Sequence, residues 1–122
     1  MAVEQRGFII SLKADTDIDQ YTVVKVSGAF ACAKCAAADV AVGVVQNDPK
    51  LGQSAAVMTN GISKVTVGAG GLTAGDLVGT DANGKAVKTT SGKVIGIALI
   101  DASEGAIGSV LIGFNNGYKA GA

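Results

Sequence analysis

The side chains that carry most enzymatic chemistry are scarce in this sequence, and the commonest of them is absent. None of the 122 residues is a histidine, although histidine is the usual general base and a frequent metal ligand in proteins. A Ser/His/Asp or Cys/His nucleophilic arrangement therefore cannot form within this chain. We expect a protein that is not an enzyme and that has no catalytic residue, no metal and no cofactor.

One Cys-x-x-Cys motif, formed by Cys32 and Cys35, is the next candidate for chemistry. A structural zinc site normally needs four Cys or His ligands, and the sequence supplies no others, although Asp39 is near. A thioredoxin-like redox pair belongs to a βαβ setting, which the neighbouring residues do not indicate. Free thiols and a local disulfide both stay open. In an extended strand the two side chains would point to opposite faces, which disfavours a bond.

Three aspartates, Asp15, Asp17 and Asp19, alternate along a polar stretch. This spacing is typical of the first half of a calcium-binding loop. The glycine and the bidentate glutamate that such a loop needs are missing, because Gln20 and Val26 occupy their positions. We predict a solvated turn here. If the chain were an enzyme, this stretch would be the most plausible place for its acids.

Two further motifs indicate turns more than ligand sites. The glycine-rich segment from Gly68 to Gly71 is not followed by the Gly-Lys-Ser/Thr or the helical pattern of a phosphate loop. Lys85 follows Asn83-Gly84 and is placed like the modified lysine of a biotinyl or lipoyl carrier, but the flanking residues of those families are absent. We predict a connector at the first motif and a type I′ turn at the second.

The elements that must position these residues are predicted to be strands. Hydrophobic residues make up 48% of the chain and aromatic residues only 4%, while 18 residues are glycine. This composition favours short strands joined by tight turns. The sequence predicts an all-β fold, a small barrel or sandwich-like domain with little or no helix. Alanine-rich Ala29 to Val40 is the best helix candidate, but the Asn83-Gly84 turn of the paired copy argues against a helix there. The expected strands span residues 7–13, 22–27, 40–45, 54–58, 61–67, 76–80, 85–89, 94–100 and 107–114.

Two parts of the chain align without a gap at a constant offset of 53 residues. For example, Asp48 matches Asp101 and Gly52 matches Gly105. We infer a duplicated unit, and chance similarity in a chain rich in Gly, Ala and Val is the alternative. The predicted division is an N-terminal arm and first strand (1–21), a β domain (22–114) with repeats at about 22–57 and 75–110, and a C-terminal tail (115–122).

Charge and hydropathy narrow the range of partners. Ten basic and ten acidic residues give a net charge of zero, and no basic stripe of the kind that binds nucleic acid is present. No segment has the roughly 20 apolar residues of a membrane span, and no secretory signal is evident. We expect no nucleic-acid or membrane partner, and synthesis in a cytoplasm.

The second repeat resembles the capsid decoration, or cement, proteins of tailed phages. The resemblance rests on a tight turn with Ala-Gly-Asp, two strands around a turn, a glycine-containing apolar strand, an acidic turn and a last strand, and it covers most of residues 22–114. These motifs are, in order, Gly71 to Val78, Asp81 to Lys88, Ile95 to Leu99, Asp101 to Gly105 and Ser109 to Ile112.

The resemblance implies a virion structural protein on the outer capsid surface. Such a protein would bind the major capsid protein and stabilise contacts between its subunits, commonly as a homotrimer and sometimes as a monomer or dimer. A non-catalytic β-rich binding module, a head fibre or a tail part is the alternative. By position, the N-terminal arm would supply the capsid contacts, which are Ala2, Val3, Glu4, Gln5, Arg6 and Phe8.

Overall fold

The computed structural model describes residues 2, 4–37, 39–90, 93–113 and 118–119, and none of these lies in a helix. The predicted all-β class is therefore confirmed, and the helix candidate from Ala29 to Val40 is wrong, because its described residues form strand β4 and loops. The strands are β1 (Gln5–Arg6), β2 (Ile9–Ala14), β3 (Val23–Gly28), β4 (Ala31–Lys34), β5 (Gly43–Val45), β6 (Ser54–Met58), β7 (Gly61–Thr66), β8 (Leu77–Thr80), β9 (Ala86–Lys88), β10 (Lys93–Val94), β11 (Gly96–Ala98), β12 (Ile107–Ile112) and β13 (Tyr118–Lys119).

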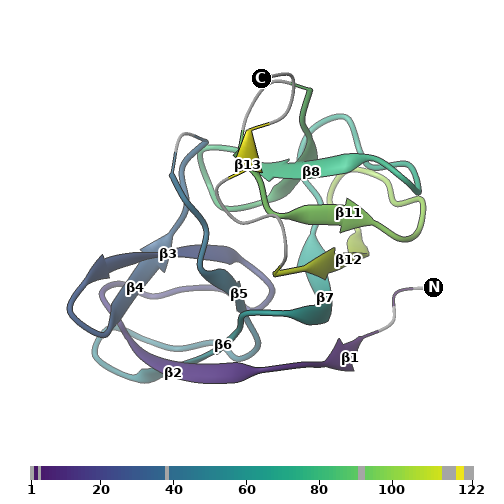
Figure 1. The fold of residues 1–122 in the computed structure, drawn as a ribbon. Coiled ribbons are helices and arrows are strands. Elements are labelled where there is room, and N and C mark those ends of the chain that lie inside the picture. Colours follow the sequence, from purple (N-terminus) through teal and green to yellow (C-terminus); the bar gives the residue numbers. More distant parts are fainter. Residues whose placement is uncertain (1, 3, 38, 91–92, 114–117, 120–122) are drawn as a thin grey trace.

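The strands form two lobes that lie side by side (Figure 1). The first lobe, residues 9–58, is a closed barrel with the strand order β2-β4-β3-β5-β6. The second lobe, residues 61–112, contains most of a six-stranded sheet with the order β1-β7-β12-β11-β8-β9. Strand β1 precedes the barrel strands in the sequence, but it pairs with β7 at the edge of the six-stranded sheet. The N-terminal segment therefore belongs spatially to the second lobe.

The two lobes have the same connectivity. Strands β7, β9, β8, β11 and β12 occupy the places that β2, β4, β3, β5 and β6 have in the barrel. The barrel closes where β2 pairs with β4 in parallel, and a single parallel bridge between Val67 and Ala86 makes the corresponding link in the second lobe. One strand arrangement is thus used twice.

The register of the strands shows where the constant offset of 53 fails. The partners Val44 and Met58 correspond to Ile97 and Leu111, at an offset of 53. By contrast, Val24 pairs with Lys34 as Val78 pairs with Lys88, at an offset of 54. The second lobe therefore has one extra residue before β8 and one fewer between β9 and β11. A shift of one residue in a strand exchanges the side chains that face inward with those that face outward. An alignment of runs of Val, Ala and Gly cannot reveal such a shift. The predicted domain boundaries stay a prediction.

Each lobe encloses equivalent buried residues, and the second lobe uses smaller ones at several positions. Val65 takes the place of Leu12, and Ala98 takes the place of Val45. The first-lobe interior contains Leu12, Ala14, Ile18, Val24, Cys32, Val45, Ala55 and Val57. The corresponding second-lobe residues are Val65, Val67, Leu72, Val78, Ala86, Ala98 and Val110.

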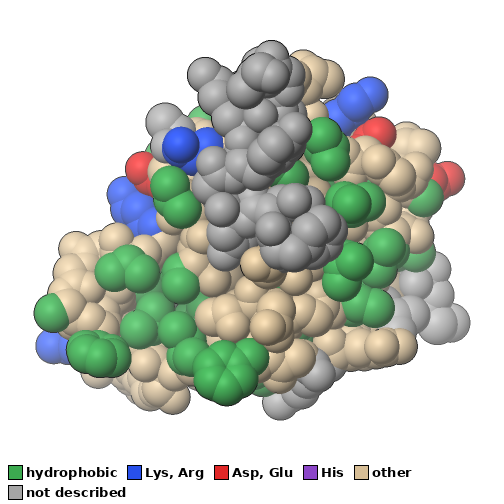
Figure 2. All heavy atoms as spheres, viewed as in Figure 1, with side chains coloured by type: hydrophobic (Ala, Val, Ile, Leu, Met, Phe, Trp, Pro, Cys, Tyr) green, Lys and Arg blue, Asp and Glu red, His purple; other side chains and the backbone are tan. Residues whose placement is uncertain are grey.

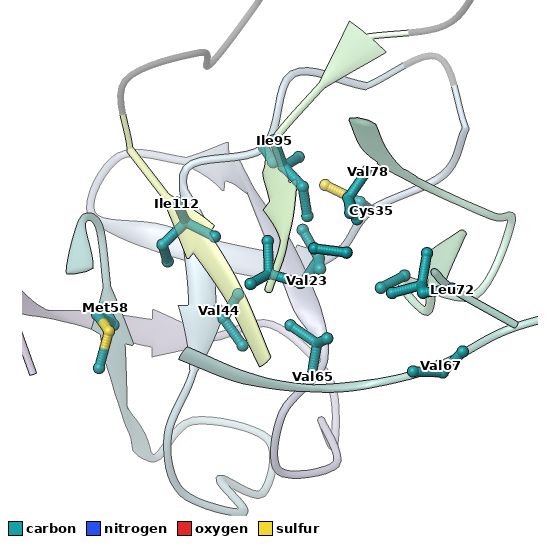
Figure 3. Close-up of a cluster of buried hydrophobic side chains, with 14 residues drawn as sticks. Val23, Cys35, Val44, Met58, Val65, Val67, Leu72, Val78, Ile95 and Ile112 are labelled. Atoms are coloured by element: carbon teal, nitrogen blue, oxygen red, sulfur yellow. The ribbon is translucent and has the colours of Figure 1, made fainter. Parts of the chain in front are cut away.

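Hydrophobic contacts and hydrogen bonds join the lobes. Val23, Val44 and Met58 of the first lobe belong to the same buried cluster as Ile95 and Ile112 of the second (Figure 3). The backbone N–H groups of residues 23 and 66 also donate across the boundary, to the carbonyl oxygens of residues 84 and 21, at 2.9 and 3.1 Å. The lobes therefore share one buried cluster, in addition to the separate cluster inside the barrel.

A glycine at the same place in each lobe allows two strands to approach closely. A Cβ atom added to Gly43 would lie 2.1 Å from the carbonyl oxygen of Met58. A Cβ atom added to Gly96 would lie 2.0 Å from that of Leu111. This explains why the apolar strand of each repeat contains a glycine, since any other residue would collide with backbone.

The turn at Asn83-Gly84 differs from the predicted type I′ turn. Such a turn needs positive φ at both central residues, but Gly84 has a φ of +73° and Asn83 is not among the residues with positive φ. The Asp81 carboxylate instead accepts hydrogen bonds from the backbone N–H groups of Asn83 and Lys85, at 2.8 and 3.0 Å. A side-chain acceptor thus organises a loop of five residues, an arrangement that the Asn-Gly pair alone does not reveal.

Candidate functional site

The two cysteines are free thiols that lie in different parts of the core. Cys32 lies inside the barrel, whereas Cys35 lies in the cluster between the lobes. Burial, reinforced by the nearby negative charge of Asp39, raises the pKa of Cys35 to about 12. Burial and the charge of Asp15 also raise the pKa of Cys32. Both thiols are therefore protonated at neutral pH, and neither is an activated nucleophile.

The aspartates near the start of the chain hold loops together. Asp15 accepts a hydrogen bond from the hydroxyl of Ser27. Asp17 accepts one from the backbone N–H of Leu51 at 2.9 Å. No group of three or more His, Cys, Asp or Glu side chains that could hold a metal ion occurs among the described residues. The alternating spacing thus reflects turn formation here.

A polar groove of about 280 Å³ lies between the lobes. Its lining includes two negatively charged residues, Asp17 and Asp19, and two positively charged residues, Lys34 and Lys85. Lys85, the residue with a carrier-like position in the sequence, thus lies beside opposite charges and does not project from an isolated turn. Because the two signs of charge balance, the groove does not favour an ion of either sign.

An open depression of about 710 Å³ lies on the barrel, beside β3. Exposed Val26 and Val40 line it, together with Lys25 and Asp39, which form an ion pair with Nζ and Oδ2 2.9 Å apart. A hydrogen bond from the backbone N–H of Ala36, together with Lys25, lowers the pKa of Asp39. Asp39 is therefore a carboxylate at neutral pH and is not poised to transfer protons.

The N-terminal arm lies along the second lobe. Gln5 pairs with Ile62 and Arg6 with Gly61, so β1 is the outermost strand of the sheet. Of the other proposed contact residues, Ala2 lines a shallow depression with second-lobe residues, Glu4 is half-buried, and Val3 lies outside the described residues. The arm is thus held by its own chain, and the proposed contact with another molecule stays a prediction.

Phe8 is an exposed aromatic side chain on a tightly held backbone. Its backbone N–H donates to Asn60 Oδ1 at 2.6 Å. Its carbonyl oxygen accepts from both the backbone N–H and the hydroxyl of Thr59, at 2.8 and 3.1 Å. The side chain itself is 64% exposed. Preorganised, exposed aromatic residues of this kind are typical anchors of protein interfaces.

Exposed hydrophobic side chains lie mainly on the barrel and on Phe8, which directly precedes strand β2. In the view of Figure 2, hydrophobic side chains are visible on both halves of the molecule, and charged side chains lie mostly toward its edges. Phe30 and Leu51, which sequence reasoning did not propose as contacts, are 83% and 68% exposed. The large exposed hydrophobic residues in the described part are Phe8, Val26, Phe30, Val40, Leu51, Leu99 and Ile107.

Comparisons with known proteins agree with this arrangement. The model of a family described as phage cement protein matches residues 4–113. Among solved structures, the chain is similar to the N base of head fibre gp8.5 of bacteriophage phi29, with a TM-score of 0.72 and 20% identity over 89% of this chain and 96% of that one. This second likeness is one of fold. A search of curated proteins finds no match. The described residues include no helix that could span a membrane.

Proposed function

Because the chain belongs to the phage cement protein family and is thus a phage virion structural protein, we propose that it binds the outer surface of the head. There it would contact the major capsid protein and stabilise the contacts between neighbouring subunits. The protein would be made in the host cytoplasm and would act as an oligomer, with a homotrimer as the first expectation. Its role is mechanical, with no catalytic step, cofactor, nucleic acid or membrane.

The observation that carries this proposal is the way in which the arm is presented. Strand β1 stands at the edge of its sheet, and such edges can accept an extended segment of a partner. Phe8 follows directly, with its backbone fixed by Asn60 and Thr59 and its side chain exposed. A fixed edge and a fixed aromatic side chain lose little conformational freedom on binding.

The family match supports the role of a cement protein, and the fold likeness supports a second candidate function. The similar solved structure is the base of a head fibre, so this chain could be the foot of a fibre that projects from the head. Both candidates require attachment to the head surface. Images of particles distinguish them, because a cement protein gives compact knobs and a fibre foot gives a longer projection.

Co-sedimentation with expanded heads that lack the protein tests the proposal. The purified chain should sediment with these heads at stoichiometric occupancy. Deleting residues 2–8 should weaken binding by about tenfold or more, the usual effect of losing an interface anchor. Phe8→Ala keeps β1 paired with β7 and separates loss of the anchor from loss of the strand. A folded wild-type protein that stays in the supernatant would contradict the proposal.

A further inference from the structure

Two non-glycine residues in the described part have a positive φ, and both stand where the other lobe has glycine. Tyr21 has a φ of +65° and Phe30 a φ of +51°. With the offset of 54 that β3 and β4 require, their counterparts are Gly75, at +95°, and Gly84, at +73°. A bulky side chain in this region is strained. Each of the two residues therefore needs a reason to be there.

For Tyr21, contact between the lobes provides a reason. Its side chain is half-buried, and its carbonyl oxygen accepts a hydrogen bond from the backbone N–H of Thr66 in the second lobe at 3.1 Å. Its own N–H donates to Val45 at 2.8 Å, as that of Gly75 donates to Ala98. The left-handed conformation of Tyr21 is thus part of the shared fold.

The backbone of Phe30 is held within the barrel, because its carbonyl oxygen accepts a hydrogen bond from the N–H of Lys13, but its ring has no such role. Phe30 lies in the turn between β3 and β4, and its side chain is 83% exposed, so its ring adds little to the core. The turn lies at the end of the barrel away from the second lobe (Figure 1). The strain at Phe30 is therefore not offset by burial in the isolated molecule, a pattern that points to function.

The equivalent turn of the second lobe contacts the first lobe. The carbonyl oxygen of Gly84 accepts a hydrogen bond from the backbone N–H of Val23 at 2.9 Å. A Cβ atom on Gly84 would lie 2.6 Å from Thr22 Cγ2, so this turn is pressed against the first lobe. The same turn thus faces inward with a glycine in one lobe and outward with a phenylalanine in the other.

The surroundings of Phe30 indicate the chemistry of the partner. The backbone N–H of Lys13 in β2 donates to the Phe30 carbonyl oxygen at 2.8 Å. On the opposite side of β2, the turn that contains Leu51 forms backbone hydrogen bonds with the next residue, Ala14. Leu51 is itself 68% exposed. Next to the Phe30 turn, exposed Lys13 and Asp15 carry opposite charges, and Asp15 bonds Ser27 of β3, so the surface around Phe30 has no excess of either charge.

The geometry points to Phe30 as a second anchor of this protein, which inserts into an uncharged apolar pocket on the capsid surface. The inference rests on the proposed function and adds a contact to it. Phe8 precedes β2 and Phe30 bonds near its end, so the two anchors are separated by roughly 17 Å, the length of five strand residues. Two separate anchors would let one molecule hold two parts of the shell.

The test replaces Phe30 with the residue that the second lobe uses at this position. Phe30→Gly should leave the Tm unchanged or raise it, because glycine relieves the strain. Its Kd for expanded heads should rise by about tenfold or more. Phe30→Leu keeps an apolar side chain and should bind within about threefold of wild type. Leu99→Ser removes an exposed hydrophobic side chain from the second lobe and should bind as wild type does.

The outcomes separate the anchor from the function on which it rests. Undiminished binding of Phe30→Gly by heads that bind the wild type would overturn the anchor alone. A clear fall in the Tm of Phe30→Gly would show that Phe30 is structural and would also overturn it, as would equal weakening by Leu99→Ser. If wild type fails to sediment, the proposed function and the anchor both fall. Wild-type binding that changes little between roughly 0.1 and 0.5 M salt would support an uncharged pocket.

Discussion

The two lobes of this protein share their framework and differ in what their turns present. In both, an aspartate after the apolar strand accepts a hydrogen bond from a turn, as Asp48 does from the N–H of Gln20 and Asp101 from that of Ala74, at 2.6 and 2.9 Å. The β3–β4 turn, however, exposes Phe30, while the β8–β9 turn packs Gly84 against the other lobe. Where two copies of one framework agree, the residue serves folding. Where they disagree, it is a candidate for function.

The largest expected effects come from the glycines that let the apolar strands pair. We predict that Gly43→Ala and Gly96→Ala each lower the free energy of unfolding by more than about 4 kcal/mol, or prevent folding, because the new methyl group would collide with backbone oxygen. Denaturant unfolding measures the change. A loss under about 1 kcal/mol at either position would break the comparison between the lobes.

A matched pair of glycines controls for backbone strain. Gly52 and Gly105 have φ values of +85° and +83°, and a Cβ atom there would meet nothing within 4 Å. Alanine at either position should cost only about 1–2 kcal/mol, the usual penalty of the left-handed conformation. Equal losses at the crowded and the open glycines would contradict the role of close strand approach.

The next effect concerns the core that the lobes share. Met58→Ala should lower the free energy of unfolding by about 3 kcal/mol, because a fully buried side chain is removed from the cluster between the lobes. Thermal unfolding should remain a single transition, with equal calorimetric and van't Hoff enthalpies. Two separate transitions in the wild-type protein would show that the lobes unfold independently, and would contradict a shared core.

The smallest effect tests the equivalence of the turns. Asp48→Ala and Asp101→Ala should each lower the free energy of unfolding by about 1 kcal/mol, since each variant loses an acceptor for one backbone N–H. The double variant should show the sum of the two losses, because the sites lie in different lobes. Unequal single losses, by more than about 1 kcal/mol, would mean that the two turns have diverged in role.

Much of this framework is predictable from sequence, because it depends on local patterns. Strand β6 has the predicted bounds of residues 54–58, and the strand predicted at residues 61–67 is β7, which spans Gly61–Thr66. The matched aspartates 48 and 101 also have equivalent roles. Period-2 patterning and turn residues carry this information directly.

The rest depends on contacts between distant segments. The slip to an offset of 54 in β8 and β9 is invisible among interchangeable small residues, and it hides the correspondence between Phe30 and Gly84. The position of the arm on β7 likewise depends on the pairing of Gln5 with Ile62. A signal for Phe30 does exist, since a phenylalanine replaces a glycine in a turn, but it emerges only once the register is known.

A density map of expanded heads saturated with this protein, obtained by electron cryo-microscopy, tests the central claim most directly. We predict compact two-lobed density on the outer surface of the shell, with the Phe8 end and the Phe30 end of strand β2 both in contact with capsid subunits. Density that contacts the shell only through the second lobe, away from β2, would contradict the predicted contact surface. If heads incubated with an excess of the protein show no added density, capsid binding itself would be contradicted.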